Sequence, residues 1–367
     1  RLFSFFARAN YSYQDKYMLS ASIRHEGSSK FAADNRWANF WSATAGWRIS
    51  NEEFMKDFDW LDDLKIRFGY GVTGNNDFSA TYMANMLGSD TNWMMPNGTW
   101  AYSYGKSQNV NPNLGWEEKK EWNLGVDYSF FEGRLYGKFD YYRREVDNLL
   151  FSVKVPQPPY TQGSQMQNIG SMESKGWEFE VGGDIIRTKD FTWSSSMNLS
   201  HNTGKILTLE GDNSYHNGNG FVAPGTPGDA ARMEAGSTIG SFYMWKFAGF
   251  DDEGSFLLYN KDGEVIPAAQ KTENDKQYIG NYTPKLIIGW SHTLTYKNFD
   301  LGINLRSWID FDVFNTINMY YGLSEVAGQN VLRNAYIDNR HIKEVKQLCD
   351  YWLEDGTFLK IDAISLG

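Results

Sequence analysis

The residues that could perform covalent or metal chemistry are few and widely spaced. The chain contains five histidines and one cysteine, and none of them stands in a G-x-S-x-G, H-x-x-E-H or C-x-x-C arrangement. A single cysteine also excludes an intrachain disulfide. We therefore expect no catalytic residue, no metal site, no cofactor and no enzyme activity. The residues concerned are His25, His201, His216, His292, His341 and Cys349.

Three further groups have simpler explanations. A calcium loop needs alternating acidic residues and a distal Glu, which the run at 251–254 (Asp-Asp-Glu-Gly) lacks, so this run predicts a tight turn. The glycines at 218, 220, 225 and 228 match no phosphate-binding fingerprint and predict a flexible loop. Glu117 and Glu118 are adjacent, so in a strand they would point to opposite faces and could not flank one glycosidic bond.

Aromatic residues are the unusual part of the composition, with Trp 14, Tyr 22 and Phe 24, or 16% of the chain. Several lie in long polar segments beside asparagines, where flat rings could stack on sugar faces or on peptide side chains. The alternative is that these rings pack the loops against one another or against a partner. The candidate ligand contacts are Trp93, Trp100, Tyr102, Tyr104, Tyr215, Tyr320 and Tyr321.

The elements that would carry these loops are strands of about ten to twelve residues, the length of a tilted membrane-spanning β-strand. Residues 300–310 show the pattern, because apolar and polar residues alternate there with a period of two. This alternation predicts a wall one strand thick, with lipid outside and water inside. We expect an apolar exterior that includes Phe68, Tyr70, Leu124, Val126, Phe179, Leu301 and Ile303. We expect a polar lumen that includes Lys65, Arg67, Asp127, Glu178, Glu180, Asn304 and Arg306.

The pattern predicts an all-β fold, an antiparallel transmembrane β-barrel represented by about thirteen strands. The predicted strands cover 2–13, 17–25, 40–49, 64–73, 121–130, 134–146, 174–186, 191–202, 242–250, 255–260, 285–296, 299–310 and 357–367. Apolar residues at helical spacing predict a short helix over 51–63. A β-sandwich is the alternative architecture, but its strands should be shorter.

The connections alternate in length, which predicts a topology. Tight turns at 14–16, 131–133, 187–190 and 297–298 would share the periplasmic rim. Long loops at 74–119, 147–172, 203–241 and 311–356 would lie on the other rim.

Composition narrows the possible partners and compartments. The net charge is −10 and no basic stripe appears, so nucleic acid is not expected as a partner. No apolar run approaches the roughly 18 residues of a transmembrane helix, and the mean hydropathy of −0.54 suits a barrel with polar loops. The chain starts at Arg1 and stops within a predicted strand, so we expect a piece of a longer protein that would not transport on its own.

Several segments, in chain order, resemble the SusC/RagA family of TonB-linked outer-membrane proteins. RHEGSSKFAADNRWANFWSATAGWRIS (24–50) is similar to its R-x-D-G-S-S-x-F-G…G-W-R-x-S block, and LKIRFGYGVTGNN (64–76) to its L-K-L-R-x-S-Y-G-x-T-G-N strand. NPNLGWEEKKEWNLGVDYSFFEGRL (111–135), NIGSMESKGWEFEV (168–181) and YWLEDGTFLKIDAISLG (351–367) resemble three later blocks. The chain departs from the family wording at Glu26, Trp41 and Ser174, all at strand ends.

The resemblance implies part of a barrel of about 22 strands whose lumen is normally plugged. It further implies an outer-membrane TonB-dependent active transporter that imports oligosaccharides or peptides. The implied partners are a SusD-like surface lipoprotein, TonB acting through a region absent from this chain, and outer-membrane lipid. Two alternatives stay open: a secreted or surface glycan-binding β-protein, and a structural barrel subunit of an envelope complex.

Overall fold

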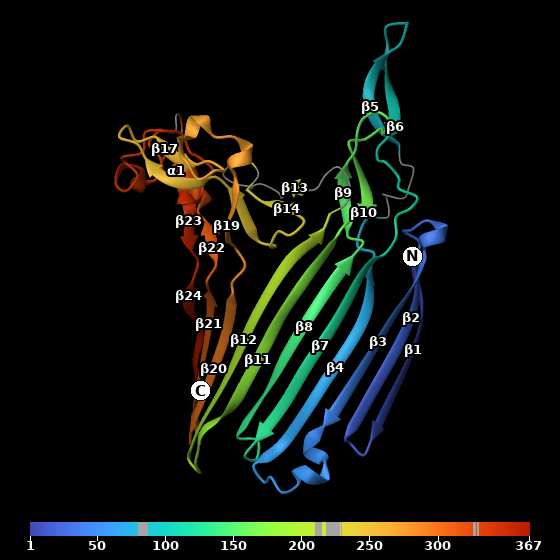
Figure 1. Ribbon diagram of the computed structural model, residues 1–367, viewed down its shortest axis with the longest axis vertical. Helices are drawn as coiled ribbons and strands as arrows, with labels where there is room; N and C mark the ends of the chain where they lie inside the picture. The colour runs from blue at the N-terminus through green and yellow to red at the C-terminus, as the bar shows by residue number, and fades with distance from the viewer. Residues whose placement is uncertain (80–86, 210–214, 218–227, 229, 326–327, 329) are drawn as a thin grey trace. The chain divides into compact units, whose positions relative to one another are not determined.

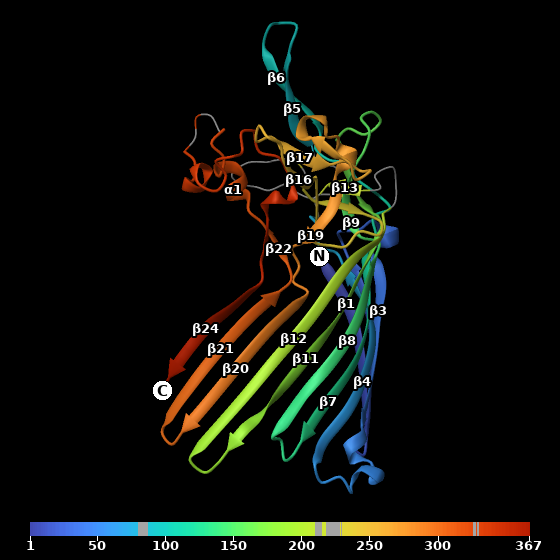
Figure 2. The ribbon, with the colours of Figure 1, turned by 60° about the vertical axis from the view of Figure 1, so that its left-hand side comes forward.

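The protein consists mainly of long antiparallel β-strands (Figures 1 and 2). A computed structural model describes residues 1–79, 87–209, 215–217, 228, 230–325, 328 and 330–367. The chain divides into two compact units, Arg1–Gly183 with Lys205–Ser214, and Asp184–Gly204 with Tyr215–Gly367. In the part of the chain that the structure describes, no helix combines the length and the apolar character needed to cross a membrane.

The long strands of the first unit pair in chain order. They are β1 (Leu2–Tyr13), β2 (Tyr17–Ser28), β3 (Trp37–Arg48), β4 (Leu61–Asn75), β7 (Glu117–Phe130), β8 (Leu135–Asp147) and β11 (Ser171–Arg187), whose last residues pass into the second unit. Two predicted tight turns join them: Gln14 and Asp15 have φ of 52° and 51°, and Phe131 and Glu132 have φ of 60° and 56°. Consecutive positive φ values give the turn a twist that matches that of the flanking strands.

The register confirms the predicted alternation in this unit, because directly paired residues share a face. Phe68 pairs with Leu124, which pairs with Tyr141, so an apolar row crosses three strands. One residue away, Arg67 pairs with Gly125, which pairs with Asp140, so the opposite face is polar. A slip of one residue would exchange the two faces, so the burial pattern specifies the register.

The long connections of this unit contain β-hairpins, where the sequence had predicted loops without strands. The connection after β4 contains β5 (Leu87–Met94) and β6 (Trp100–Lys106), and the connection after β8 contains β9 (Leu150–Lys154) and β10 (Ser164–Asn168). A short η1 turn (Ala33–Asn35) follows β2. A small aromatic core lies beside these connections and is formed by Phe31, Phe40, Phe78, Leu114 and Trp116. This core could not be predicted because its members are far apart in the sequence.

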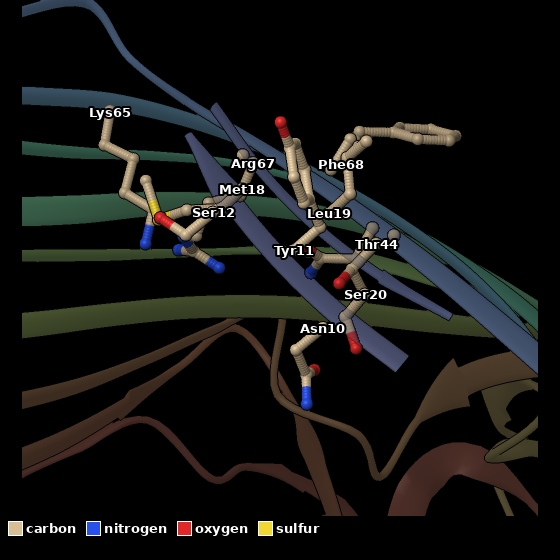
Figure 3. Close-up of a pocket in the computed structure, with 14 residues that line it drawn as sticks. Asn10, Tyr11, Ser12, Met18, Leu19, Ser20, Thr44, Lys65, Arg67 and Phe68 are labelled. Carbon is tan, nitrogen blue, oxygen red and sulfur yellow. The ribbon is translucent and has the colours of Figure 1, made fainter. Parts of the chain in front are cut away.

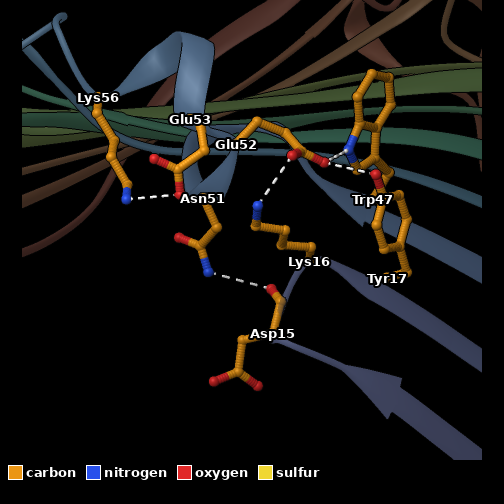
Figure 4. A network of polar contacts seen from close by, with 8 residues as sticks. All are labelled: Asp15, Lys16, Tyr17, Trp47, Asn51, Glu52, Glu53 and Lys56. Carbon is orange, nitrogen blue, oxygen red and sulfur yellow. Dashed lines mark hydrogen bonds and ion pairs between the residues drawn. The ribbon is translucent and has the colours of Figure 1, made fainter.

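The predicted helix over 51–63 is wrong. Residues 49–60 form two single 3₁₀ turns, η2 (Ile49–Asn51) and η3 (Glu53–Met55), and β4 already begins at Leu61. The apolar residues of this segment have no core to cover: Phe54 is 61% exposed and Trp60 is 49% exposed. The Glu52 carboxylate instead ties the segment to the ends of β2 and β3 (Figure 4).

The second unit contains four long strands, shown side by side in Figure 2: β12 (Phe191–Thr208), whose residues from Lys205 on belong to the first unit, β20 (Leu286–Tyr296), β21 (Phe299–Ile309) and β24 (Phe358–Leu366). Leu301 and Ile303 share a face with Leu294 and His292, whereas Asn304 pairs with Ser291 on the other face. The Lys297 amide donates to the Asp190 carbonyl at 2.9 Å, so the two tight turns of this unit are neighbours.

The remaining elements of this unit surround a second aromatic core. They are β13 (Tyr215–Asn217) with β14 (Arg232–Glu234), β15 (Ser241–Met244) with β19 (Gln277–Asn281), and β16 (Lys246–Phe250) with β17 (Phe256–Tyr259) and β18 (Val265–Pro267). They also include β22 (Asp312–Phe314) with β23 (Leu353–Asp355), α1 (Thr316–Tyr321), η5 (Ala268–Gln270), η6 (Glu273–Asp275), η7 (Arg333–Tyr336) and η8 (Asp350–Trp352). The core contains Met244, Trp245, Phe256, Met319 and Trp352.

The sequence predicts about thirteen strands. Eleven of them are long strands of the two units, and the two predicted over 242–250 and 255–260 are not. The first is interrupted at Trp245, which bridges to Cys349 and donates from Nε1 to the Thr272 carbonyl at 2.8 Å. The predicted turn at 251–254 is confirmed, because the Asp251 amide and the Ser255 carbonyl close it at 3.0 Å.

Candidate functional site

The polar face of the first unit carries a network of ion pairs. Arg67 on β4 donates from Nε and Nη2 to both carboxylate oxygens of Asp127 at 2.8 Å, and from Nη2 to Asp140 Oδ1 at 3.1 Å. Further along the same face, Lys138 Nζ lies 3.1 Å from Glu180 Oε2. A bidentate arginine holds both partners in a fixed orientation. The arrangement provides an ordered, hydrophilic wall and no nucleophile.

A shallow concavity of about 550 Å³ lies beside these charges on β1–β4 and β7 (Figure 3). Asn10 and Ser20 point to one side of the strands, and Tyr11 and Phe68 point to the other (Figure 3). Gly46 and Gly69 are also among the residues that line it, and their lack of side chains leaves room there. The lining of this concavity therefore includes side chains from both the charged and the apolar face of the strands.

The second unit has a separate polar cleft of about 320 Å³. His201 Nδ1 donates to the Lys285 carbonyl at 2.6 Å, and Lys285 Nζ contacts Asp310 Oδ2 at 2.6 Å. Asp312 Oδ2 accepts a hydrogen bond from the Asn281 amide at 2.8 Å. The cleft thus offers donors and acceptors beside β12 and at the ends of β20 and β21. Sequence reasoning missed it because its residues come from four separate segments.

The aromatic residues predicted as ligand contacts lie in two kinds of environment, an exposed hairpin of the first unit and the second unit. Trp100, Tyr102 and Tyr104 alternate along β6 on one face, and they are 67%, 70% and 68% exposed. Trp93 on β5 pairs with Ala101 and therefore points to the opposite face of the same hairpin. One flat ligand on one face of this hairpin could thus contact three of these four rings, but not Trp93.

The other three candidates lie in the second unit. Tyr320 is buried in its aromatic core, with Lys346 Nζ 4.6 Å from the ring centre. Tyr321 packs partly buried against the same core. The Tyr215 backbone pairs with Glu234, and its side chain lies outside the described residues. Tyr320 and Tyr321 are therefore core residues of the second unit, unlike the exposed rings of β6.

An asparagine clamp joins the two hairpin-containing connections of the first unit. Asn109 is buried, donates from Nδ2 to the Gln162 and Ser164 carbonyls at 2.7 and 2.9 Å, and accepts from the Thr161 amide. Asn168 likewise accepts from the Gly115 amide at 2.7 Å and donates to its carbonyl at 3.0 Å. An asparagine side chain can bond the backbone as a strand does, so these residues fix the base of the β5–β6 hairpin.

Metal and nucleophilic chemistry find no support in the described residues. Within them, no group of three His, Cys, Asp or Glu side chains is placed to hold a metal ion. Cys349 is fully buried, and burial raises the pKa of its thiol to about 12, so the reactive thiolate is not populated near neutral pH.

Comparison with known proteins gives a consistent picture. The family profile described as TonB dependent receptor-like, beta-barrel matches residues 1–336. The TonB-dependent receptor SusC of Bacteroides thetaiotaomicron is 32% identical over 386 residues, which cover 100% of this chain and 37% of SusC. The TonB-dependent receptor P39 of Formosa agariphila is 35% identical over 287 residues, covering 76% of this chain and 25% of that receptor.

Solved structures agree with the sequence relatives. The RagAB peptide importer in its closed-closed state has a TM-score of 0.84 and 25% identity, covering 100% of this chain and 40% of that chain. The same importer in its open-open state has a TM-score of 0.82 with the same identity and coverage. This chain therefore spans well under half the length of the proteins that it matches.

Antiparallel strands with one apolar and one charged face, joined by long connections with exposed aromatic rings, define the class: an outer-membrane β-barrel. The chain belongs to the TonB-dependent receptor β-barrel family, and its similarity to SusC and to RagAB places it among the SusC/RagA-like members. The apolar face is accordingly the lipid-facing exterior, and the face with Arg67 is the lumenal one.

Proposed function

We propose that this chain forms part of the barrel of a TonB-dependent transporter that imports oligosaccharides or peptides across the outer membrane. The observation that carries the proposal is the charged lumenal face, in which Arg67, Asp127 and Asp140 cross three neighbouring strands. Such a lining keeps the interior of the barrel compatible with water and with polar solutes. Relatives named as TonB-dependent receptors and as a peptide importer support it. They also support a transporter and not an enzyme.

The proposal includes partners and capture residues. The partners are TonB and a SusD-like surface lipoprotein, which the similarity to SusC and to the two-component RagAB importer supports. The capture surface is the β6 face with Trp100, Tyr102 and Tyr104, because exposed rings in one row can stack on a sugar or a peptide.

An uptake experiment tests the proposal in cells that carry the full-length gene and its lipoprotein. Fluorescent oligosaccharides of several linkages and peptides of matched length are supplied to these cells. We expect uptake of one class to be lost when either the receptor gene or TonB is deleted. If the uptake of every probe is unchanged in both deletion strains, import is refuted and a structural role in the envelope is favoured.

A further inference from the structure

The connection between β3 and β4, residues 49–60, differs from the other turns at its end of the first unit. The turns after β1 and β7 have three and four residues, whereas this connection has two 3₁₀ turns and exposes three large rings. Phe54, Phe58 and Trp60 are 61%, 43% and 49% exposed. Neither the proposed transport function nor the core explains why a turn should present these rings.

The hydrogen bonds of Glu52 place this connection on the lipid-facing side. Its Oε1 accepts from Tyr17 Oη at 2.7 Å and from Trp47 Nε1 at 3.0 Å, and its Oε2 lies 3.1 Å from Lys16 Nζ (Figure 4). Tyr17 and Trp47 are paired on the apolar face, in the row that continues through Ile66 and Val126. The Glu52 carboxylate therefore accepts hydrogen bonds from the polar groups of two lipid-facing aromatic side chains.

A chain of aromatic contacts leads from the same face into the connection. Tyr128 stacks on Phe130 with ring centres 5.5 Å apart, Phe130 stacks on Trp60 at 5.6 Å, and Trp60 meets Phe58 edge-on at 6.0 Å. Tyr128 and Phe130 share the apolar face of β7 with Leu124 and Val126, since they follow at every second position. Trp60 and Phe58 thus extend the lipid-facing surface without a break, and Phe54 is exposed on the same connection.

The charges of the connection fit an interface between lipid and water. Glu52 is paired with Lys16, and Glu53 Oε1 is paired with Lys56 Nζ at 2.7 Å. Asp57 and Asp59 alternate in sequence with Phe58 and Trp60 and are exposed. Aromatic rings with their polar ends turned to water are enriched at membrane interfaces, where one end is apolar and the other is hydrated.

We infer that residues 49–60 form an interfacial foot, which rests on the glycerophospholipids of the periplasmic leaflet and inserts Phe54 and Phe58 among their headgroups. The continuity of its rings with the lipid-facing strands selects a phospholipid surface as the occupant, in preference to a second copy or a soluble partner. Glu52 serves as the tie that holds the foot against β2 and β3.

Spin labels on the full-length protein test this inference. Accessible native cysteines are removed, and single labels are placed by Phe54→Cys, Phe58→Cys and, as the matched control, Asp57→Cys. In phospholipid nanodiscs, we expect the labels at 54 and 58 to collide severalfold more with oxygen, relative to a water-soluble nickel chelate, than the label at 57. Equal exposure of all three labels to the chelate would overturn the inference.

Two further measurements keep the result decisive. The same labels are compared in nanodiscs that contain a phospholipid with a nickel-chelating headgroup, and the labels at 54 and 58 should collide frequently with that headgroup. An absence of such collisions would mean that protein covers the foot, and would also overturn the inference. Glu52→Gln should increase chelate exposure of the label at 58, and heat-dependent gel migration reports whether each variant keeps a folded barrel. Unchanged exposure in a folded Glu52→Gln barrel would refute the role of Glu52 as the tie.

Discussion

Replacing Arg67 by methionine should destabilise the barrel, because two carboxylates on neighbouring strands would lose their shared cation. Arg67 makes contacts of 2.8, 2.8 and 3.1 Å with Asp127 and Asp140. Hydrogen bonds to charged groups contribute about 1.5–3 kcal/mol when shielded, whereas exposed ion pairs contribute roughly 0.2–1 kcal/mol. The side chains of Arg67 and Asp127 are each 32% exposed, and that of Asp140 is 14% exposed. We therefore expect Arg67→Met to lower the free energy of unfolding by about 1–3 kcal/mol.

The assay is urea unfolding of the full-length protein in lipid, followed by heat-dependent gel migration. Arg8→Met is the matched control, since Arg8 also lies on the polar face and hydrogen-bonds the neutral side chains of Asn10 and Ser20. Adding Asp127→Asn and Asp140→Asn to Arg67→Met should recover part of the loss, because the repulsion between the uncompensated carboxylates disappears. A wild-type midpoint for Arg67→Met, or a triple variant no more stable than Arg67→Met, would refute this reasoning.

Four other outcomes follow from the structure. Gly125→Ala should destabilise the same cluster, because its Cβ would lie 2.6 Å from Asp140 Oδ1 and 2.7 Å from Arg67 Nη2; urea unfolding measures this. Trp100→Ala should weaken ligand binding by the full-length protein with its lipoprotein about five- to tenfold, a stacking contribution of about 1 kcal/mol. Trp93→Ala on the opposite face should have little effect, and calorimetry that ranks the two variants in reverse would contradict the capture surface. Hydrogen bonds from Tyr17, Trp47 and Lys16 lower the pKa of Glu52 from 4.5 to about 2. The stability it adds is therefore complete above pH ~4.5 and is lost as the pH falls toward about 2. Label mobility at position 58 should rise across that window in the wild type and not in Glu52→Gln. We predict that the short-turn rim is periplasmic, so cysteine labelling of intact cells should reach Asn97→Cys and not Thr188→Cys; the reverse pattern would invert the topology.

Local pattern was sufficient to predict which residues share a face of each long strand. The side-chain period of a strand is fixed at two by its backbone geometry, so Phe68 and Leu124 could be assigned to one face and Arg67 and Asp127 to the other without knowledge of neighbours. The tight turns at 131–133 and 297–298 could likewise be predicted from a few adjacent residues. The helix predicted over 51–63 failed because its apolar spacing belongs to rings that cover no core, while Glu52 bonds to strands distant in sequence.

The sequence by itself therefore determined the all-β class, the two faces of the wall, the alternation of short and long connections and the resemblance to the family. Tertiary structure alone decided that Arg67 reaches both Asp127 and Asp140, that Trp93 points away from Trp100, and that Tyr320 is buried. It also assembled the cleft that contains Lys285, Asp310 and Asp312. The physical reason is the range of the interactions. Alternation follows from backbone geometry over a few residues, whereas ion pairs, stacked rings and clefts depend on strand register and on packing between segments tens of residues apart.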